Sequence, residues 1–194
     1  MTISLTKGQK ISLEKESGGG LSRVAMGLGW DAVKRKGILG FFSGGSQEID
    51  LDATCIMFDA AKNQVDVVWF RQLQSKDGSI KHSGDNRTGA GEGDDETITV
   101  DLSRVPANVT TLVFTINSFS GQTFDQIENA FCRLVNLSNN QEIAKYTLSG
   151  GGNVTAQIMS KIYRHNNEWK MAAIGEPANG RTFQDILPNI VPYL

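Results

Sequence analysis

The chain has 194 residues, of which 39% are hydrophobic and 21% are charged, and its 19 Lys and Arg against 21 Asp and Glu give a formal net charge of −2. This size and composition are those of a globular protein with a substantial core, and the near-neutral charge gives no reason to expect nucleic-acid binding. No apolar run approaches the roughly 20 residues of a membrane-spanning helix, and the first residues lack the apolar core of a signal peptide. We therefore expect no integral membrane segment and a cytoplasmic location.

Most apolar segments are short and alternate with the two-residue period of β-strands. RHNN at 164–167 predicts a hairpin turn between two of them, and VDVVWFR is apolar on both faces, as expected of a strand inside a sheet. The candidate strands cover 9–15, 51–58, 65–71, 97–102, 110–117, 129–136, 141–148, 155–163 and 168–175.

Helical signals are few. Thr123 with Gln126 three residues later forms a capping-box pattern, and RTFQDIL near the end predicts a short helix with Thr182 as its cap and Pro188 as its stop. We see no linker and no repeat. The sequence thus predicts an all-β fold, an antiparallel β-sandwich with one or two short helices, as a single domain over residues 1–194.

The segment 31–48 is too long for a tight connection. Within it, Val33–Gly45 carries three cations followed by Ile, Leu and two Phe. One interpretation is a long hairpin whose apolar tip folds back on the body, and the other is an exposed surface that contacts a partner or an anionic membrane.

The stretch SGDNRTGAGEGDDETITVDLS at 83–103 concentrates negative charge on a flexible backbone. Asp85 to Glu96 contain five acids and three glycines, with Arg87 as the single cation. Carboxylate, amide and backbone oxygens are the ligands that Ca²⁺ prefers, whereas sulfur and imidazole ligands for zinc or copper are absent from the loop. The oxygen donors are Asp85, Asn86, Glu92, Asp94, Asp95 and Glu96, with carbonyls exposed by Gly89, Gly91 and Gly93.

Known loop patterns do not fit this stretch. It matches an EF-hand only at its first and last acids, it lacks the tandem copies of the calcium-binding nonapeptide, and a phosphate-binding loop would need a following Lys-Ser/Thr. Asp50 and Asp52 in IDLDA project from one face of a predicted strand, and Asp31 follows Trp30. From these residues alone, a calcium site and a solvated acidic turn both remain open. His82, beside the loop, is expected at the surface.

Six segments in this order resemble the TerD family of tellurium-resistance and stress proteins, and the insertion VKRKGILGFFSGG resembles its TerZ- and TerX-like branch. They are GLGWD (27–31), IDLDA (49–53), WFRQL (69–73), HSGDNRTGAGEGDDE (82–96), VDLSRVP (100–106) and GQTFDQIENAFCRLVN (121–136). The resemblance implies a calcium-binding β-sandwich. The ligands it implies are Asp50, Asp52, Asp85, Asn86, Asp94, Asp95 and Glu96, with Thr88, Gly89 and Gly91 through backbone carbonyls and Asp31 as a secondary candidate.

The expected function is therefore that of a calcium-binding stress-response protein of the tellurium-resistance type, which binds the ion and protein partners and is not an enzyme. Other Ter-family proteins are candidate partners, with Val33–Gly45 as the candidate contact. The alternative is a metal-dependent hydrolase that uses the acidic loop. Direct capture of tellurite by thiols is disfavoured, because Cys55 and Cys132 both lie in apolar runs and are expected to be buried.

Overall fold

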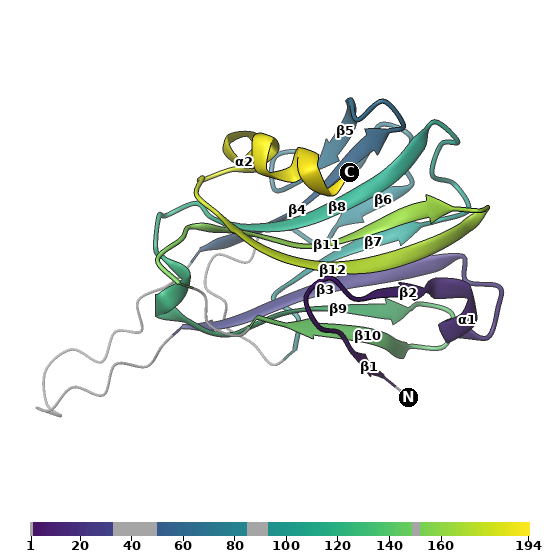
Figure 1. Ribbon diagram of the computed structural model, residues 1–194, viewed down its shortest axis with the longest axis horizontal. Helices are drawn as coiled ribbons and strands as arrows, with labels where there is room; N and C mark the ends of the chain where they lie inside the picture. Colours follow the sequence, from purple (N-terminus) through teal and green to yellow (C-terminus); the bar gives the residue numbers. More distant parts are fainter. Residues whose placement is uncertain (1, 33–49, 85–92, 149–151) are drawn as a thin grey trace, which may run out of the picture.

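The computed structural model describes residues 2–32, 50–84, 93–148 and 152–194, and within these ranges it leaves the side chains of residues 31, 32, 128 and 129 undescribed. The described chain forms two six-stranded sheets that pack face to face (Figure 1). This confirms the predicted β-sandwich.

The first sheet has the strand order β1-β10-β9-β3-β7-β6. All of its neighbours pair antiparallel except β1 and β10, which pair parallel. Its strands are β1 (Ile3–Ser4), β10 (Gln141–Thr147), β9 (Ile127–Asn136), β3 (Arg23–Ala32), β7 (Glu96–Asp101) and β6 (Ile80–His82).

The second sheet has the order β2-β12-β11-β8-β4-β5, and all of its neighbours pair antiparallel. Its strands are β2 (Lys10–Ser12), β12 (Glu168–Ala178), β11 (Ala156–His165), β8 (Val109–Ser118), β4 (Leu51–Asp59) and β5 (Gln64–Val68). Asn166 and Asn167 join β11 to β12 with φ of 51° and 62°, which is the two-residue turn that suits the twist of a hairpin. The predicted hairpin is confirmed.

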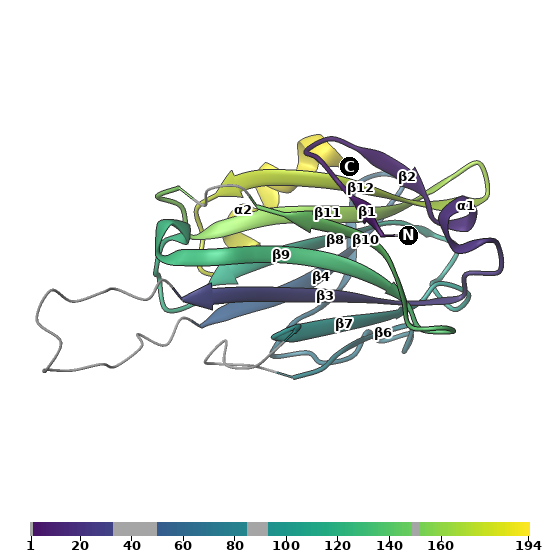
Figure 2. The same ribbon diagram turned by 90° about the horizontal axis from the view of Figure 1, so that it is seen from below.

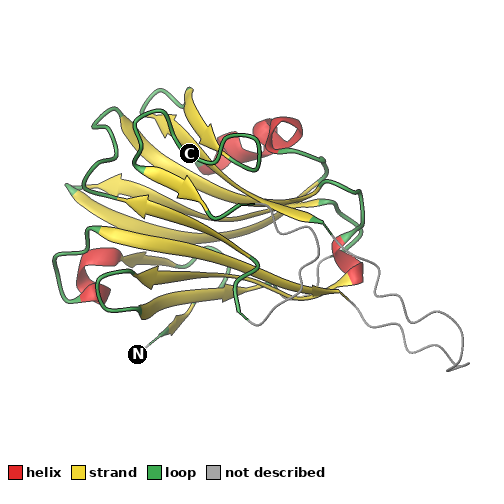
Figure 3. Ribbon diagram, turned by 180° about the vertical axis from the view of Figure 1, so that it is seen from behind, coloured by secondary structure: helices red, strands yellow, loops and turns green. Residues whose placement is uncertain are grey.

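Two apolar clusters explain which strands are buried on both faces. The larger cluster fills the space between the sheets and includes Met26, Ile98 and Phe114. The smaller one lies on the outer face of the second sheet, where α2 (Phe183–Ile190) covers it (Figures 1 and 3). Residues 51–58 of β4 are all buried, because this strand contributes alternate side chains to both clusters.

The structure corrects three local predictions. The strand predicted at 9–15 ends at Ser12, whose hydroxyl accepts a hydrogen bond from the Lys15 N–H and caps α1 (Leu13–Ser17). Thr123 precedes only the short 3₁₀ helix η1 (Phe124–Gln126), because β9 begins at Ile127. The segment 65–71 is not an inner strand, since β5 ends at Val68 and lies at a sheet edge.

Pro188 does not stop the last helix. Thr182 caps α2 as predicted, with the Asp185 carboxylate accepting the Thr182 N–H in a capping box, but α2 continues through Pro188 to Ile190. Ile186 and Ile190 are fully buried in the smaller cluster, so packing compensates for the hydrogen bond that proline cannot donate. The 3₁₀ helix η2 (Val191–Tyr193) follows.

The topology brings several chain segments to one end of the sandwich. β3 and β6 finish there, whereas β4 and β7 begin there, and Figure 2 shows these strand ends gathered on one side of the molecule. We call this the acidic end, because Asp50, Asp52, Asp94, Asp95 and Glu96 lie on it. None of the helices within the described ranges combines the length and the apolar character needed to cross a membrane.

The attachment of α2 can be tested by truncating its buried side chain. We expect Ile186→Ala to lower the free energy of unfolding by about 2–5 kcal/mol, because it leaves a cavity between α2 and the second sheet. Val191→Ala, at a residue that is 44% exposed, is the control and should change it by less than about 0.5 kcal/mol. Chemical denaturation measures both, and equal losses would contradict this packing.

Candidate functional site

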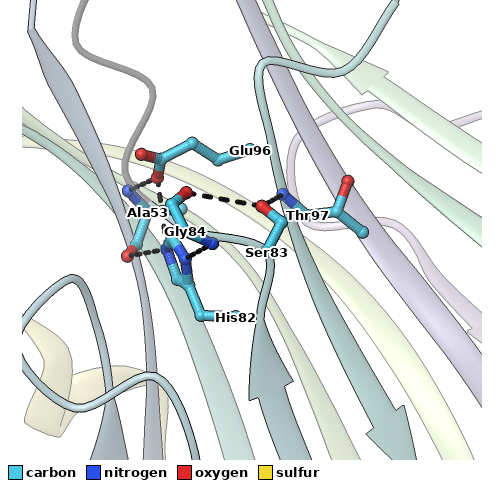
Figure 4. A network of polar contacts seen from close by, with 6 residues as sticks. All are labelled: Ala53, His82, Ser83, Gly84, Glu96 and Thr97. Carbon is cyan, nitrogen blue, oxygen red and sulfur yellow. Dashed lines mark hydrogen bonds and ion pairs between the residues drawn. The ribbon is translucent and has the colours of Figure 1, made fainter.

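The site begins where β4 extends beyond the end of its neighbour β5. The last residue of β5, Val68, pairs with Cys55, so β5 offers no partner to the backbone of Ala53 two residues earlier in β4. The Ala53 N–H donates instead to Glu96 Oε2 at 2.7 Å, and the Ala53 carbonyl oxygen lies 3.2 Å from His82 Nε2 (Figure 4). A buried carboxylate and a buried imidazole therefore take the place of a missing strand.

His82 and Glu96 also contact each other. His82 Nε2 lies 3.2 Å from Glu96 Oε2, and both side chains are fully buried. The Gly84 N–H donates to His82 Nδ1 at 3.0 Å, so Nδ1 is an acceptor and Nε2 carries the ring proton toward Ala53 and Glu96. The expectation that His82 is a surface residue is wrong. His82 lies two residues after Ile80 in β6, so both side chains are on the buried face of this strand.

The contacts of Glu96 join the two sheets. Glu96 shares the inward face of β7 with Ile98 and Val100, and its carboxylate reaches β4 of the opposite sheet. The segment IDLDA and the end of the acidic stretch therefore lie side by side, although more than 40 residues separate Ala53 from Glu96 in the chain. The two acidic segments that the sequence singled out meet at this contact.

Asp94 points to the outer face of the first sheet. Its Oδ1 accepts a hydrogen bond of 2.7 Å from Arg133 Nε, and Arg133 Nη1 donates to Glu142 Oε2 at 3.2 Å. The Asp94 carboxylate fills the space over Gly27, where a Cβ atom would lie 2.0 Å from Asp94 Oδ2. Hydrogen bonding to Asp94, and secondarily to Glu142, raises the pKa of the Arg133 guanidinium despite partial burial. Arg133 is thus a counter-charge that the loop sequence did not reveal.

Asp95 continues the ladder of the first sheet beyond β7. Its N–H donates to the Leu28 carbonyl oxygen at 2.8 Å, and its Oδ2 accepts the Trp30 N–H, also at 2.8 Å. The Asp95 carboxylate therefore accepts the hydrogen bond from β3 that a backbone carbonyl of a neighbouring strand would otherwise accept. Trp30 is buried in the larger cluster, and Trp69 and Trp169 pack against the clusters.

Asp50 and Asp52 approach the acidic end from the second sheet. Asp52 is 5% exposed, and it alternates with Leu51 and Ala53, so its side chain points away from the larger cluster toward the outer face of this sheet. The Asp50 carbonyl oxygen accepts the Phe119 N–H at 3.2 Å. Asp52, Glu96 and Asp94 thus project, respectively, outside the second sheet, between the sheets and outside the first sheet.

Several predicted ligands lie outside the described residues. These are Asp85, Asn86, Thr88, Gly89 and Gly91, together with the candidate donor Glu92. The predicted partner contact Val33–Gly45 also lies outside the described residues. For Asp31 the backbone is described as part of β3, but the side chain is not. Within the described part of the chain, no group of three or more His, Cys, Asp or Glu side chains converges as a metal cage.

The donor chemistry at the acidic end still fits one class of ion. The predicted ligands described there, Asp50, Asp52, Asp94, Asp95 and Glu96, are all carboxylates, and both nitrogens of His82 contact protein groups. Hard oxygen donors suit Ca²⁺, whereas zinc sites use thiolate and imidazole.

Both cysteines are buried in the larger cluster, as predicted. Burial raises the pKa of the Cys132 thiol to about 12 and raises that of Cys55 further. Since the thiolate is the reactive form, the folded protein presents no reactive thiol near neutral pH.

The role of Glu96 can be tested by removing its carboxylate. We expect Glu96→Ala to lower the free energy of unfolding by at least about 1–3 kcal/mol, because it leaves the buried Ala53 N–H without an acceptor. Glu96→Gln keeps an amide oxygen for that bond and should lose less. The control is Glu16→Ala, at an exposed position in α1. Urea denaturation measures all three, and equal stability of Glu96→Ala and the control would refute this role.

The burial of the thiols predicts their reactivity. At pH 8 a thiol reagent should leave Cys55 and Cys132 unmodified in the folded protein and modify both after unfolding in denaturant. Rapid modification without unfolding would contradict the described burial.

Comparisons with known proteins place these features in a family. The TerD domain model matches residues 1–189. The chain is 49% identical to the tellurium resistance protein TerZ of Serratia marcescens over 97% of each chain, and 43% identical to the stress response protein SCP2 of Bacillus subtilis (strain 168) over 98% of this chain and all of that protein.

A solved structure shares the fold. It is that of a homologue of telluride resistance protein (TerD), SCO6318 from Streptomyces coelicolor A3(2), which superposes with a TM-score of 0.67 at 21% identity over 87% of this chain and 96% of that one. The match to the TerD model and the similarity to TerZ confirm the predicted resemblance, including its TerZ- and TerX-like character. The chain therefore belongs to the TerD family.

Proposed function

We propose that this chain is a calcium-binding stress-response protein of the tellurium-resistance type, which acts by binding and not by catalysis. Its relatives named for tellurium resistance and for stress response match nearly its whole length, which supports the general role. Calcium would supply positive charge to a surface on which acidic side chains from both sheets meet.

The contact between Ala53 and Glu96 is the observation that carries this proposal. It brings the strand containing Asp52 against the end of the acidic stretch, so that carboxylates from two distant segments border the same end of the sandwich. Like charges gathered at one end of the sandwich repel unless water, hydrogen bonds or a cation compensate them. A bound Ca²⁺ would relieve that repulsion and fasten the segment between β6 and β7.

The described contacts divide the candidate ligands into two groups. Asp94 and Glu96 accept hydrogen bonds that anchor the acidic stretch to β9 and β4, so we assign them mainly to positioning. Asp50, Asp52 and Asp95 are the described carboxylates that we propose to hold the ion. The remaining proposed ligands are Asp85, Asn86, Thr88, Gly89, Gly91 and, secondarily, Asp31.

The surroundings of His82 support binding over catalysis. A general base needs a ring nitrogen directed at substrate, but His82 is buried and both of its nitrogens face protein groups. We propose that protein partners, including other members of the Ter family, recognise the calcium-loaded surface, with Val33–Gly45 as a candidate contact.

Calorimetric titration with Ca²⁺ tests the proposal. We expect saturable binding, and at 100-fold excess of calcium over its Kd the free energy of unfolding should rise by about 2.7 kcal/mol, because only the folded chain gathers the ligands. Mg²⁺ should bind more weakly, since it needs a stricter octahedral shell.

A pair of variants locates the ion. Asp50→Asn combined with Asp52→Asn should weaken calcium binding at least about tenfold by removing two charged ligands. Asp59→Asn, at the last residue of β4 and at the far end of that strand from Asp50 and Asp52, is the matched control and should bind like the unaltered protein. Absence of binding at millimolar calcium, or equal loss in both variants, would overturn the proposal.

A further inference from the structure

A cleft of about 540 Å³ opens on the side of the sandwich formed by β1, β10 and β12, away from the contact between β4 and β7. The connection from β1 to β2 crosses here from the first sheet to the second, held by the bonds from the Leu5 N–H to the Lys145 carbonyl oxygen and from the Gly8 N–H to the Ala173 carbonyl oxygen. This volume lies in the range of about 300–1,000 Å³ that is typical of small-molecule sites. The lining comes from that connection, the end of β10, Gly152, Val154, β11 and β12.

Tyr146 places its hydroxyl at this cleft. The residue is 7% exposed, and none of the described residues makes a hydrogen bond with its hydroxyl group. The oxygen lies directly over Gly175, where a Cβ atom would come within 1.8 Å of it. A hydroxyl that faces a cleft without a protein partner is open to hydrogen bonding by water or a ligand.

The backbone of β12 is shaped to make room for this hydroxyl. The register between β11 and β12 shifts so that Ile174 and Gly175 together stand opposite Met159, which is a β-bulge. Gly175 has a φ of 61°, a conformation that disfavours other residues. Bulges of this kind frequently lie next to functional sites, where they redirect the chain. The bulge and Tyr146 therefore form one arrangement.

Lys7 supplies positive charge at the same cleft. Its Nζ donates to Glu176 Oε2 at 3.0 Å, which leaves two of its three N–H donors for another acceptor, and its side chain is 58% exposed. Burial raises the pKa of the Tyr146 hydroxyl, and the charge of Lys7 acts in the opposite direction. The two groups are thus within electrostatic reach of each other.

The other walls are mixed, with Thr6, Thr147 and Gln157 as their polar members. Leu5, Leu148, Val154 and Pro177 line the cleft beside the two donors. The apolar part of this lining suits a molecule with an apolar body, and the donors Tyr146 and Lys7 suit a hydrogen-bond-accepting head, of which a negative one gains most from Lys7.

We propose that this cleft binds a small monocarboxylic acid, whose carboxylate accepts hydrogen bonds from the Tyr146 hydroxyl and the Lys7 ammonium and whose apolar body lies against Leu148 and Val154. The site is separate from the acidic end and goes beyond the calcium-binding function proposed for it. None of the residues that line the cleft belongs to the candidate calcium ligands.

Three probes of similar shape test this site by amide NMR on the full chain. Hexanoate at about 10 mM, a concentration that saturates sites of low-millimolar affinity, should shift the amides of Leu148, Gly152 and Gly175. Hexanol should bind at least about tenfold more weakly, because it lacks the charge, and hexylamine should not bind. If hexanoate shifts none of these amides, or if hexanol binds as tightly, the proposal fails.

Substitutions then separate recognition from folding. Tyr146→Phe removes only a hydroxyl without a described partner, so the Tm should stay unchanged while the Kd for hexanoate rises about tenfold or more. The matched control is Tyr163→Phe, at a tyrosine on β11 outside the cleft.

Lys7→Met should raise the same Kd about two- to fivefold, with Lys15→Met on α1 as its control. Unaltered hexanoate binding in Tyr146→Phe would overturn the proposal. A lowered Tm together with unaltered binding would assign the hydroxyl to the fold.

Discussion

The backbone of Ala53 imposes the constraint on which the acidic end depends. β4 is buried on both faces, yet it extends past the last residue of β5, so its N–H and carbonyl groups would be left without partners in a dry interior. Glu96 and His82 satisfy both groups and each other, from strands of the opposite sheet. The same contacts that hold the two sheets together at this edge therefore fix the ends of the segment between β6 and β7.

This arrangement gives the acidic residues different tasks. Glu96 connects the sheets, Asp94 binds Arg133 across the outer face of the first sheet, and Asp95 completes the ladder beside Trp30. Three of the five described carboxylates thus organise the ends of the acidic stretch through protein contacts. In the proposed function, Asp95 also joins Asp50 and Asp52 in holding an ion whose other ligands come from the preceding part of the acidic stretch.

Much of the fold could be predicted from the sequence because the strands obey local rules. Alternating apolar residues marked most strands, and Asn166-Asn167 marked the hairpin between β11 and β12. The failures were those that depend on tertiary context. Because Ile190 is packed in the smaller cluster, α2 continues past Pro188. β5 lies at a sheet edge, and its sequence is nevertheless apolar because Val67 packs in the cluster under α2. At the site, the acidic residues were visible in the sequence, but the counter-charge of Arg133 follows only from the register of β3 and β9, which places Arg133 opposite Gly27.

The central claim is that Ca²⁺ binds at the acidic end and is coupled to the contacts of Ala53, His82 and Glu96. Amide NMR spectra recorded during a calcium titration test it most directly. The account predicts that the largest shifts fall on Trp30, Ala53 and Gly84, whose N–H groups donate to acidic or histidine side chains at that end, whereas Gly8 and Gly175 at the opposite edge stay unshifted. Shifts confined to the opposite edge, or none at millimolar calcium, would contradict it.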